Sequence, residues 1–288
     1  MSQPTAAEAF WDAHHHVTED PGFWMAHPLC RAAINRRVCG DPFIWPFEAF
    51  GLTFAREPFE NGLSLGCGTG ALERAARTLG ICDRILALDA SETSLAVARS
   101  RAREKGILSI TYQKADLNTV RLERARFDAV FIHQSLHHVT EIERLLDEVS
   151  DALLPKGLLF LDEWTGPSRD EWNGDRLARA SALFEELPEN WRRWPVLLAP
   201  VEVNDPSEAV RSSAILPAVR RILDVMIERP YGGHLVALLL PQIAREKIPE
   251  GELDRLLAAW LAMEDEDLGR DDCTSYHTAL VARSRPRT

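Results

Sequence analysis

A turn with three alternating glycines, Gly66-Cys67-Gly68-Thr69-Gly70, limits the possible folds of this chain more than any other feature. The apolar segment Leu63-Ser64-Leu65 precedes it, and a segment with helical periodicity follows from Ala71. Glycines allow positive φ angles and let a ligand approach the backbone, while the free N–H groups of a helix start form a polar cradle. The sequence therefore predicts a strand, a ligand-binding turn and a helix within an α/β sheet.

An acidic residue ends the next predicted strand. Asp89 comes 19 residues after Gly70, where a carboxylate can accept hydrogen bonds from both hydroxyls of a ribose. A plain strand–helix turn with a solvated acid explains this combination less well. The turn also fits a nicotinamide dinucleotide, because its first two glycines and Ala71 satisfy G-x-G-x-x-G/A. A P-loop is excluded, since no lysine stands in the turn.

Short apolar runs alternate with segments of helical period from Gly62 to Glu163, which predicts a parallel sheet with crossover helices. The predicted strands are Gly62–Gly66, Arg84–Asp89, Ser109–Ala115, Phe127–Ile132 and Gly157–Asp162. The predicted helices are Ala71–Leu79, Thr93–Lys105 and Glu141–Leu154. Ser91 and Thr140 are predicted N-caps, and Gly80, Gly106 and Gly157 are predicted to end helices.

The flanking segments are less regular. Residues 1–60 are predicted to form an irregular N-terminal arm or lid with one helix at Pro28–Val38, and residues 61–165 to form the cofactor-binding core. Residues 166–288 are predicted to add a helical substrate or lid insert and the last two strands of the same sheet. The helices expected there are Glu171–Leu187, Ser207–Arg221, Gly233–Arg245 and Glu252–Glu264, and the strands are Leu223–Arg229 and Tyr276–Ala282.

The charge of the chain excludes some partners. Its formal net charge of −11 argues against a nucleic-acid backbone and against a polybasic membrane anchor. The best apolar run, Leu235–Leu240, is far shorter than the roughly 20 residues of a membrane span. The N-terminus lacks the pattern of a secretory signal, and five cysteines without a C-x-x-C pair predict free thiols. We therefore expect a soluble, cytoplasmic protein, and the sequence gives no oligomeric state.

Four motifs in order resemble those of class I S-adenosylmethionine-dependent methyltransferases. They are the glycine turn, Asp89 after the second strand, Asp116-Leu117-Asn118 after the third, and Phe127–Phe131 with Ser135-Leu136-His137-His138 behind the fourth. One departure is Pro155-Lys156-Gly157-Leu158, where the family usually has Pro-Gly-Gly. The resemblance covers about 100 residues and is specific for the cofactor rather than for the methyl acceptor.

This resemblance implies a doubly wound α/β fold with a seven-stranded Rossmann-like sheet whose last strand is antiparallel. It also implies S-adenosyl-L-methionine as the cofactor and a role for each matching position. The turn residues Gly66, Cys67, Gly68 and Gly70 would approach the methionine and ribose portions, and His133 would lie near the methionine moiety. Asp89 would hold the ribose diol. At the adenine, Ala90 and Ser91 would flank the ring, Asp116 would accept from the amino group, and the Leu117 N–H would face the ring.

The segment Asp162-Glu163-Trp164-Thr165-Gly166-Pro167-Ser168-Arg169 resembles a bacterial subgroup with D-E-[YW]-x-G-P-S-R after the fifth strand. Segments 205–212 and 231–233 accompany it in that subgroup. The subgroup does not fix one acceptor. The resemblance therefore stops at the cofactor and the fold.

Candidate catalytic residues lie at the carboxyl ends of the fourth and fifth strands. His137 and His138 could remove a proton from an alcohol acceptor, although one could cap the next helix and another could pack in the core. Strand alternation points Asp162 and Glu163 to opposite sides, and Glu163 is predicted to face the ligand crevice. No metal site is predicted, because the histidine spacing matches no helical zinc motif. The tract His14-His15-His16 resembles a metal-binding tract, but it lies inside an arm rich in Trp and Phe and is assigned to the lid.

The sequence thus predicts a methyltransferase that acts on a small-molecule acceptor, with O-methylation favoured over N-methylation. A protein that binds S-adenosylmethionine without catalysis, as a regulator or scaffold, is the first alternative. An NAD(P)-dependent oxidoreductase is the second. The N-terminal aromatic residues could either seal the site or pack the arm onto the domain; these are Trp11, Phe23, Trp24, Trp45 and Phe47.

Overall fold

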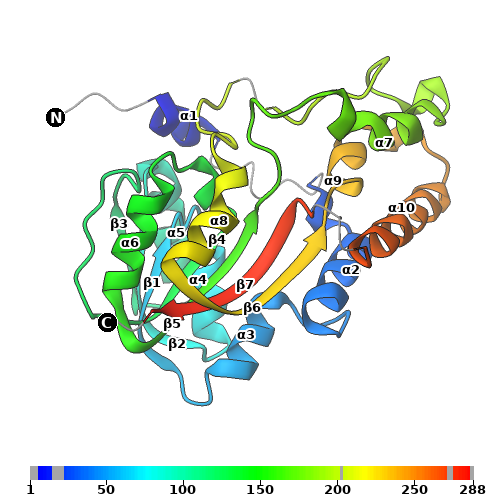
Figure 1. The fold of residues 1–288 in the computed structure, drawn as a ribbon. Coiled ribbons are helices and arrows are strands. Elements are labelled where there is room, and N and C mark those ends of the chain that lie inside the picture. Colours follow the sequence, from blue (N-terminus) through cyan, green and yellow to red (C-terminus); the bar gives the residue numbers. More distant parts are fainter. Residues whose placement is uncertain (1–5, 15–22, 202–203, 271–274, 286–288) are drawn as a thin grey trace.

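The computed structural model describes residues 6–14, 23–201, 204–270 and 275–285 (Figure 1). A seven-stranded sheet with the order β3-β2-β1-β4-β5-β7-β6 lies at its centre. The strands are β1 Phe59–Leu65, β2 Cys82–Asp89, β3 Ile110–Lys114, β4 Phe127–His133, β5 Leu153–Trp164, β6 Leu223–Gly232 and β7 His277–Ser284. Among these strands β7 runs antiparallel to both of its neighbours, whereas β1 to β5 pair in parallel. The predicted fold class is confirmed.

The strand order reverses beside β1, which pairs with β2 on one side and with β4 on the other. Ligands of open α/β sheets bind outside the carboxyl ends of the strands at such a switch point. Leu65 pairs with both Leu88 and Ile132, so the ends of these three strands lie level with one another. His133 pairs with Asp162 at the same edge. The register therefore brings the glycine turn, Asp89 and the end of β4 together.

Helices cover both faces of the sheet. The α-helices are α1 Ala6–His14, α2 Pro28–Cys39, α3 Pro46–Phe54, α4 Ala71–Thr78, α5 Glu92–Glu104, α6 Ile142–Ala152, α7 Gly174–Glu185, α8 Ile215–Ile222, α9 Val236–Leu239 and α10 Glu252–Leu268. Alternate residues of β4 enter different cores, as the pleat of a strand requires. Val130 and Ile132 pack with α6 and α8, whereas Ala129 and Phe131 pack with α3, α4 and α5.

A third core lies beside β6 and β7, where α2, α7, α9 and α10 gather (Figure 1). Tyr231, Phe184 and Trp260 are buried there. Arg37 of α2 fastens α10 to this core, because its guanidinium contacts Glu264 and Asp265. The division of the chain at residues 60 and 165 stays a prediction.

The N-terminal segment is more helical than predicted. Both α1 and α3 form where an irregular arm was expected, and α2 matches the predicted helix within one residue. Phe47, Phe50 and Phe54 recur at helical spacing after Pro46, which occupies the first helical turn. Phe47 and Phe50 are buried against Phe131 and Phe160 of the sheet. Helix α3 therefore belongs to the sheet core and is no lid.

Two helices predicted in the C-terminal part are shorter in the structure. The helix expected at Ser207–Arg221 begins only at Ile215, because the side chain of Asp205 accepts hydrogen bonds from the backbone and hydroxyl of Ser207 and holds a turn there. The helix expected at Gly233–Arg245 is limited to Val236–Leu239 and one 3₁₀ turn, Leu240–Gln242. Pro241 removes a backbone donor and stops the α-helix.

Two predicted helix boundaries are also wrong. Thr140 is not the N-cap of α6; Glu141 holds that position, and Asn118 Oδ1 accepts from the N–H groups of both residues. Helix α6 ends at Ala152, and Gly157 lies inside β5 rather than at a helix end. The predicted N-cap Ser91 is confirmed, since its Oγ accepts from the Ser94 N–H.

Candidate functional site

The glycine turn is tight at two positions and open at one. Gly66, Gly68 and Gly70 all have positive φ, at 71°, 51° and 78°. A Cβ on Gly66 would lie 2.3 Å from the Cβ of Ser135, so glycine is required where the turn meets the segment after β4. Beside Gly68, no atom of the described residues lies within 4 Å of a Cβ position. The backbone of Gly68 is therefore the side that a ligand can approach.

Asp89 ties this turn to the start of α5. Its Oδ2 accepts from the Gly68 N–H at 2.7 Å and its Oδ1 from the Ser91 N–H at 2.8 Å. Burial raises the pKa of Asp89, while backbone hydrogen bonds from Ser91, Gly68 and Ala90 oppose the rise. A carboxylate offers about four acceptor positions, so these three donors leave room for a further hydroxyl donor. The roles of Asp89, Ala90 and Ser91 toward a ribose and an adenine stay predictions.

The third predicted motif closes the site on the β3 side. Asp116 Oδ1 accepts from the Asn118 N–H at 2.9 Å, and its Oδ2 accepts from the Thr119 hydroxyl at 3.1 Å. This turn presents Leu117, which is 9% exposed, beside the switch point. Asp116 keeps one free acceptor position on Oδ2 by the same count of lone pairs.

Helix α1 lies across the carboxyl ends of the strands (Figure 1). Asp12 Oδ1 accepts from the Ser91 hydroxyl at 2.6 Å and from the Thr93 N–H at 3.1 Å. The ring of Trp11 meets the ring of His138 edge-on at 4.9 Å. The predicted lid role of Trp11 stays a prediction. Asp12, which connects α1 to Ser91 and Thr93 at the start of α5, was not identified from the sequence.

We expect Asp12→Ala to weaken the binding of S-adenosylhomocysteine by about two- to tenfold. Each lost hydrogen bond is worth about 0.5–1.5 kcal/mol, and without them α1 is held less firmly over the site. Calorimetric titration measures this change. Asp83→Ala is the control, because Asp83 is an exposed acid at the far end of β2 that pairs with Arg77. Equal affinity of the two variants would contradict the closing role of Asp12.

Glu163 holds the segment after β4 and is not open to a crevice, which corrects its predicted orientation. Its side chain is 0% exposed. Its carboxylate accepts from the backbone N–H groups of Ser135, Leu136 and Trp164 and also contacts His137 Nδ1. All its acceptor directions face protein donors. Glu163 therefore orients the 3₁₀ turn Leu136–His138, and its predicted service as a base stays untested.

The two imidazoles of this turn have different electrostatic surroundings. Burial would lower the pKa of His137, but the carboxylates of Glu163 and Glu208 overcome it and raise the pKa to about 9. Burial and the neighbouring His137 hold the pKa of His138 well below its usual value. His138 is thus the neutral imidazole of the pair, the form that can accept a proton.

On the opposite side of β4 and β5, Asp162 anchors a second polar group. Its Oδ1 accepts from the Tyr231 hydroxyl at 2.6 Å, and its Oδ2 lies 3.6 Å from His133 Nε2. Burial raises the pKa of Asp162, and His133 opposes that rise. The side chain of His133 is 33% exposed, and its ring meets the ring of Trp45 at 5.9 Å. His133 is therefore accessible at the end of β4, while Tyr231 is buried.

A buried carboxyl lies beneath the glycine turn. Glu73 of α4 is 0% exposed and contacts the Ser64 hydroxyl, while its Oε2 has no hydrogen-bond partner among the described residues. Burial raises the pKa of Glu73 from 4.5 to about 7, despite the Ser64 hydrogen bond and the nearby Arg74. The sequence analysis did not identify Glu73.

Replacing Glu73 with Gln is expected to make the stability less dependent on pH. Because folding raises the pKa of Glu73, the protonated form stabilises the fold, and this contribution is lost as the pH rises from about 4.5 through about 7. As the pH rises from about 5.5 to 8, the parent chain should lose about 1–2 kcal/mol of unfolding free energy that Glu73→Gln does not lose. Urea unfolding at both pH values measures it. A pH-independent difference would contradict the burial argument.

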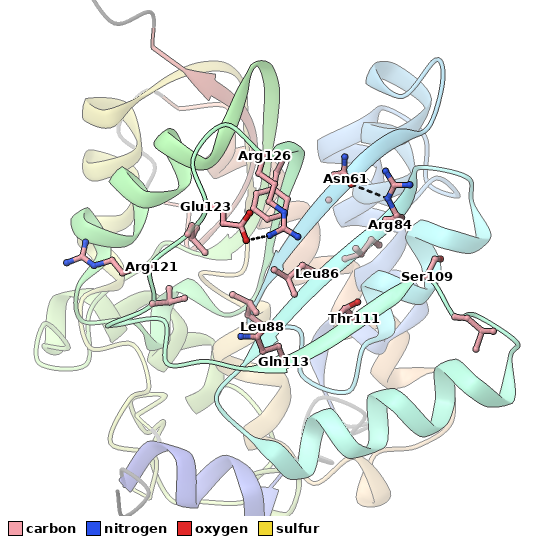
Figure 2. A pocket seen from close by; sticks show the side chains of 16 residues that line it. Asn61, Arg84, Leu86, Leu88, Ser109, Thr111, Gln113, Arg121, Glu123 and Arg126 are labelled. Atoms are coloured by element: carbon pink, nitrogen blue, oxygen red, sulfur yellow. Dashed lines mark hydrogen bonds and ion pairs between the residues drawn. The ribbon is translucent and has the colours of Figure 1, made fainter. Parts of the chain in front are cut away.

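A separate cavity of about 560 Å³ opens on the sheet face at β2 and β3 (Figure 2). Residues 115–126, which the structure describes in full, form no helix, so this part of the face is not covered by one. Leu86, Thr111 and Gln113 line the cavity, and its rim holds the ion pair between Arg126 and Glu123. The fully described glycine turn does not border it. The cavity is therefore not part of the predicted cofactor site.

Three further sequence predictions concern membrane spans, cysteines and the histidine tract. No helix in the described part of the chain combines the length and apolar content needed to cross a bilayer. The four cysteines that the structure describes are free. The side chains of the tract His14-His15-His16 lie outside the described residues.

The site fits the cofactor that the motifs imply. The open backbone of Gly68 leaves room for a ligand, and the two carboxylates of Asp89 and Asp116 provide acceptors for a ribose diol and an exocyclic amine.

A family model matches part of this chain. Residues 63–161 match the family described as "Methyltransferase domain". The ubiquinone biosynthesis O-methyltransferase of Chelativorans sp. (strain BNC1) is 32% identical over 109 residues, which make up 37% of this chain and 42% of that protein. The chain spans about half the length of the curated relatives it matches.

Two solved structures resemble the whole chain. The [4+2]-cyclase SpnF covers 99% of this chain and 97% of its own, with 17% identity and a TM-score of 0.52. Phosphoethanolamine N-methyltransferase 2 of Haemonchus contortus, solved with S-adenosyl-L-methionine, covers 98% of this chain and 60% of its own, with 15% identity and a TM-score of 0.56. These likenesses show the fold. The subgroup indicated by residues 162–169 stays a prediction.

Proposed function

We propose that this chain transfers the methyl group of S-adenosyl-L-methionine to an oxygen atom of a small-molecule acceptor. The observation that carries the proposal is the imidazole of His138, which contacts Ser207 Oγ and belongs to the 3₁₀ turn after β4. Ser135, at the start of this turn, packs against Gly66 of the glycine turn. The curated relatives that match part of the chain are named O-methyltransferases, which supports oxygen as the acceptor atom.

The cofactor would occupy the switch point between β1 and β4. Asp89 would accept from the ribose hydroxyls, with the open backbone of Gly68 beside them. Leu117 and Asp116 would meet the adenine, and His133 would lie near the methionine portion. The bound cofactor supplies a methyl group on a positively charged sulfur. The remaining proposed contacts are Gly66, Cys67, Gly70, Ala90 and Ser91.

The acceptor needs alignment and loss of one proton. Methyl transfer is an in-line displacement, so the acceptor oxygen must face the S–CH₃ bond with water excluded. His138 would take the hydroxyl proton as the oxygen–carbon bond forms and the carbon–sulfur bond breaks. Glu163 and His137 would keep the turn in place. Helix α1, with Trp11 against His138, would exclude water.

An acceptor panel tests this function. Purified chain is incubated with S-adenosylmethionine and phenols, catechols, aliphatic alcohols or amines, and S-adenosylhomocysteine formation is measured. Turnover with a hydroxyl class and not with amines is the expected result. Turnover with amines alone would move the acceptor atom to nitrogen.

The same panel addresses the alternatives. Tight S-adenosylhomocysteine binding with no turnover on any acceptor class would favour a regulator or scaffold. The net charge of −11 supports a small molecule rather than a nucleic acid as the acceptor. A cytoplasmic location and the absence of a membrane partner remain part of the proposal.

A further inference from the structure

Three side chains that are distant in sequence converge next to the proposed acceptor position. His137 and His138 belong to the 3₁₀ turn after β4, and Glu208 belongs to the loop before α8. The Nε2 atoms of both imidazoles lie 3.8 Å from the same oxygen, Glu208 Oε2. The three potential ligand atoms lie within 4.8 Å of one another. This spacing is compact enough to surround one ion.

The Nδ1 atom of each imidazole already contacts a side-chain oxygen of the protein. His137 Nδ1 contacts the Glu163 carboxylate, which also accepts from the backbone of the same turn. His138 Nδ1 lies 3.2 Å from Ser207 Oγ. Metal-binding histidines usually donate their second ring N–H to such a partner, which fixes the ring and directs the other nitrogen to the metal.

The partners of His138 also determine its tautomer. The Ser207 hydroxyl lies 2.6 Å from Asp205 Oδ1, and because a carboxylate only accepts, the hydroxyl donates its single proton there. Ser207 Oγ must therefore accept from His138 Nδ1–H. In a neutral imidazole this leaves the lone pair on Nε2, which faces Glu208.

The charge around the cluster favours a cation. Carboxylates of Glu163, Asp205 and Glu208 surround the two imidazoles. Asp205 is 1% exposed, and its Oδ2 has no hydrogen-bond partner among the described residues. Carboxylates withdrawn from water need a compensating positive charge, which a protonated His137 supplies in the metal-free chain and a bound cation would supply in its place.

We propose that His137, His138 and Glu208 bind one divalent transition-metal ion, and that this ion holds the hydroxyl group of the methyl acceptor. Two imidazoles and one carboxylate are a common set for zinc and for ferrous iron at sites with open positions. Tetrahedral zinc with bonds of about 2.0–2.1 Å places its ligand atoms about 3.3 Å apart. The two imidazole–carboxylate distances of 3.8 Å would each shorten by about 0.5 Å, and the imidazole–imidazole distance, which is at most 4.8 Å, by up to about 1.5 Å. The ligand side chains are 9%, 17% and 27% exposed, which leaves room for an acceptor oxygen.

The chemical role of the ion rests on the proposed O-methylation. A hydroxyl bound to a divalent metal loses its proton more readily, and that proton passes to water. The resulting oxyanion forms a bond to the methyl carbon while the carbon–sulfur bond breaks. The products are the methyl ether, S-adenosylhomocysteine and one proton, so charge and atoms balance. His138 then acts as a ligand, and the ion replaces it in promoting proton loss.

Metal binding is tested without cofactor or acceptor. His14, His15 and His16 are first replaced by Ser, so that this tract does not contribute to the measurement. The chain is then stripped with a chelator and titrated with Zn²⁺ against a chromophoric competitor. One tightly bound ion per chain is expected. Glu208→Ala and His138→Ala should each weaken binding at least about 100-fold, and Glu163→Gln, which alters only an outer partner, about 10- to 100-fold. Co²⁺ should give the visible spectrum of a four- or five-coordinate site.

His27→Ala is the matched control, because His27 faces Asp254 in another part of the molecule and should leave the affinity unchanged. Circular dichroism confirms that each variant is folded. Failure of folded chain to bind Zn²⁺ or Co²⁺, or binding that Glu208→Ala leaves unchanged, would overturn the metal site. Methyl transfer that survives in the metal-free chain would overturn its role with the acceptor and leave O-methylation with His138 as base intact.

Discussion

Loss of His138 is expected to lower kcat by about 10²–10⁴ while the affinity for the cofactor stays nearly unchanged. His138→Ala removes the imidazole that the segment Asp205–Ser207 orients, and the methyl group of alanine can neither take a proton nor bind a metal. Steady-state methyl transfer gives kcat, and calorimetry with S-adenosylhomocysteine gives the affinity. Both the imidazole as base and the imidazole as metal ligand predict this loss. The zinc titration separates the two.

His137→Ala and Glu163→Gln should be measured beside it. Glu163 touches only protein groups, so Glu163→Gln is expected to lower kcat less than His138→Ala does. A larger loss in Glu163→Gln would assign Glu163 the function of the base after all. If all three variants keep near-parental turnover, the proton leaves to water and an amine acceptor becomes the better hypothesis.

Asp89→Ala is expected to weaken S-adenosylmethionine binding by at least about tenfold and up to about 100-fold. A hydrogen bond to a charged group is worth about 1.5–3 kcal/mol, and the variant also releases the Gly68 and Ser91 N–H groups that shape the turn. Asp89→Asn, which keeps the size but loses the charge, should lie between the parent and Asp89→Ala. Calorimetry measures all three.

Asp83→Ala provides the control for this series, because Asp83 lies in the same strand but at its exposed opposite end. Unchanged affinity in Asp89→Ala would remove Asp89 from the site. Thermal stabilisation of the parent chain by NAD rather than by S-adenosylhomocysteine would favour the oxidoreductase alternative.

Local sequence determined the cofactor half of the fold. The turn from Gly66 to Gly70 needs positive φ at three positions, and only glycine adopts these without strain, so the motif and its geometry are inseparable. The five parallel strands were predicted within a few residues, because the central ones are apolar runs that are buried on both faces of the sheet. Ser91 at the N-cap of α5 is likewise a local signal.

Tertiary packing decided what the local pattern could not. Alternation placed Asp162 and Glu163 on opposite faces, but it did not show that the backbone N–H groups of Ser135 and Leu136 would meet Glu163. Helix α3 was missed because Phe47 and Phe50 stand in a segment dense with aromatic residues and prolines, and only their burial against β4 and β5 separates a core helix from a lid.

The acceptor side of the site depends most on the tertiary structure. His137 and His138 are adjacent in sequence, whereas Glu208 lies 70 residues beyond His138 in a segment whose sequence predicted a helix. The bonds from Asp205 to Ser207 replace that helix with a turn, and the turn brings Glu208 to the imidazoles. A sequence reveals ligands when they share one helix or one loop. It does not reveal a cluster whose members meet only because a sheet edge and a distant loop pack together.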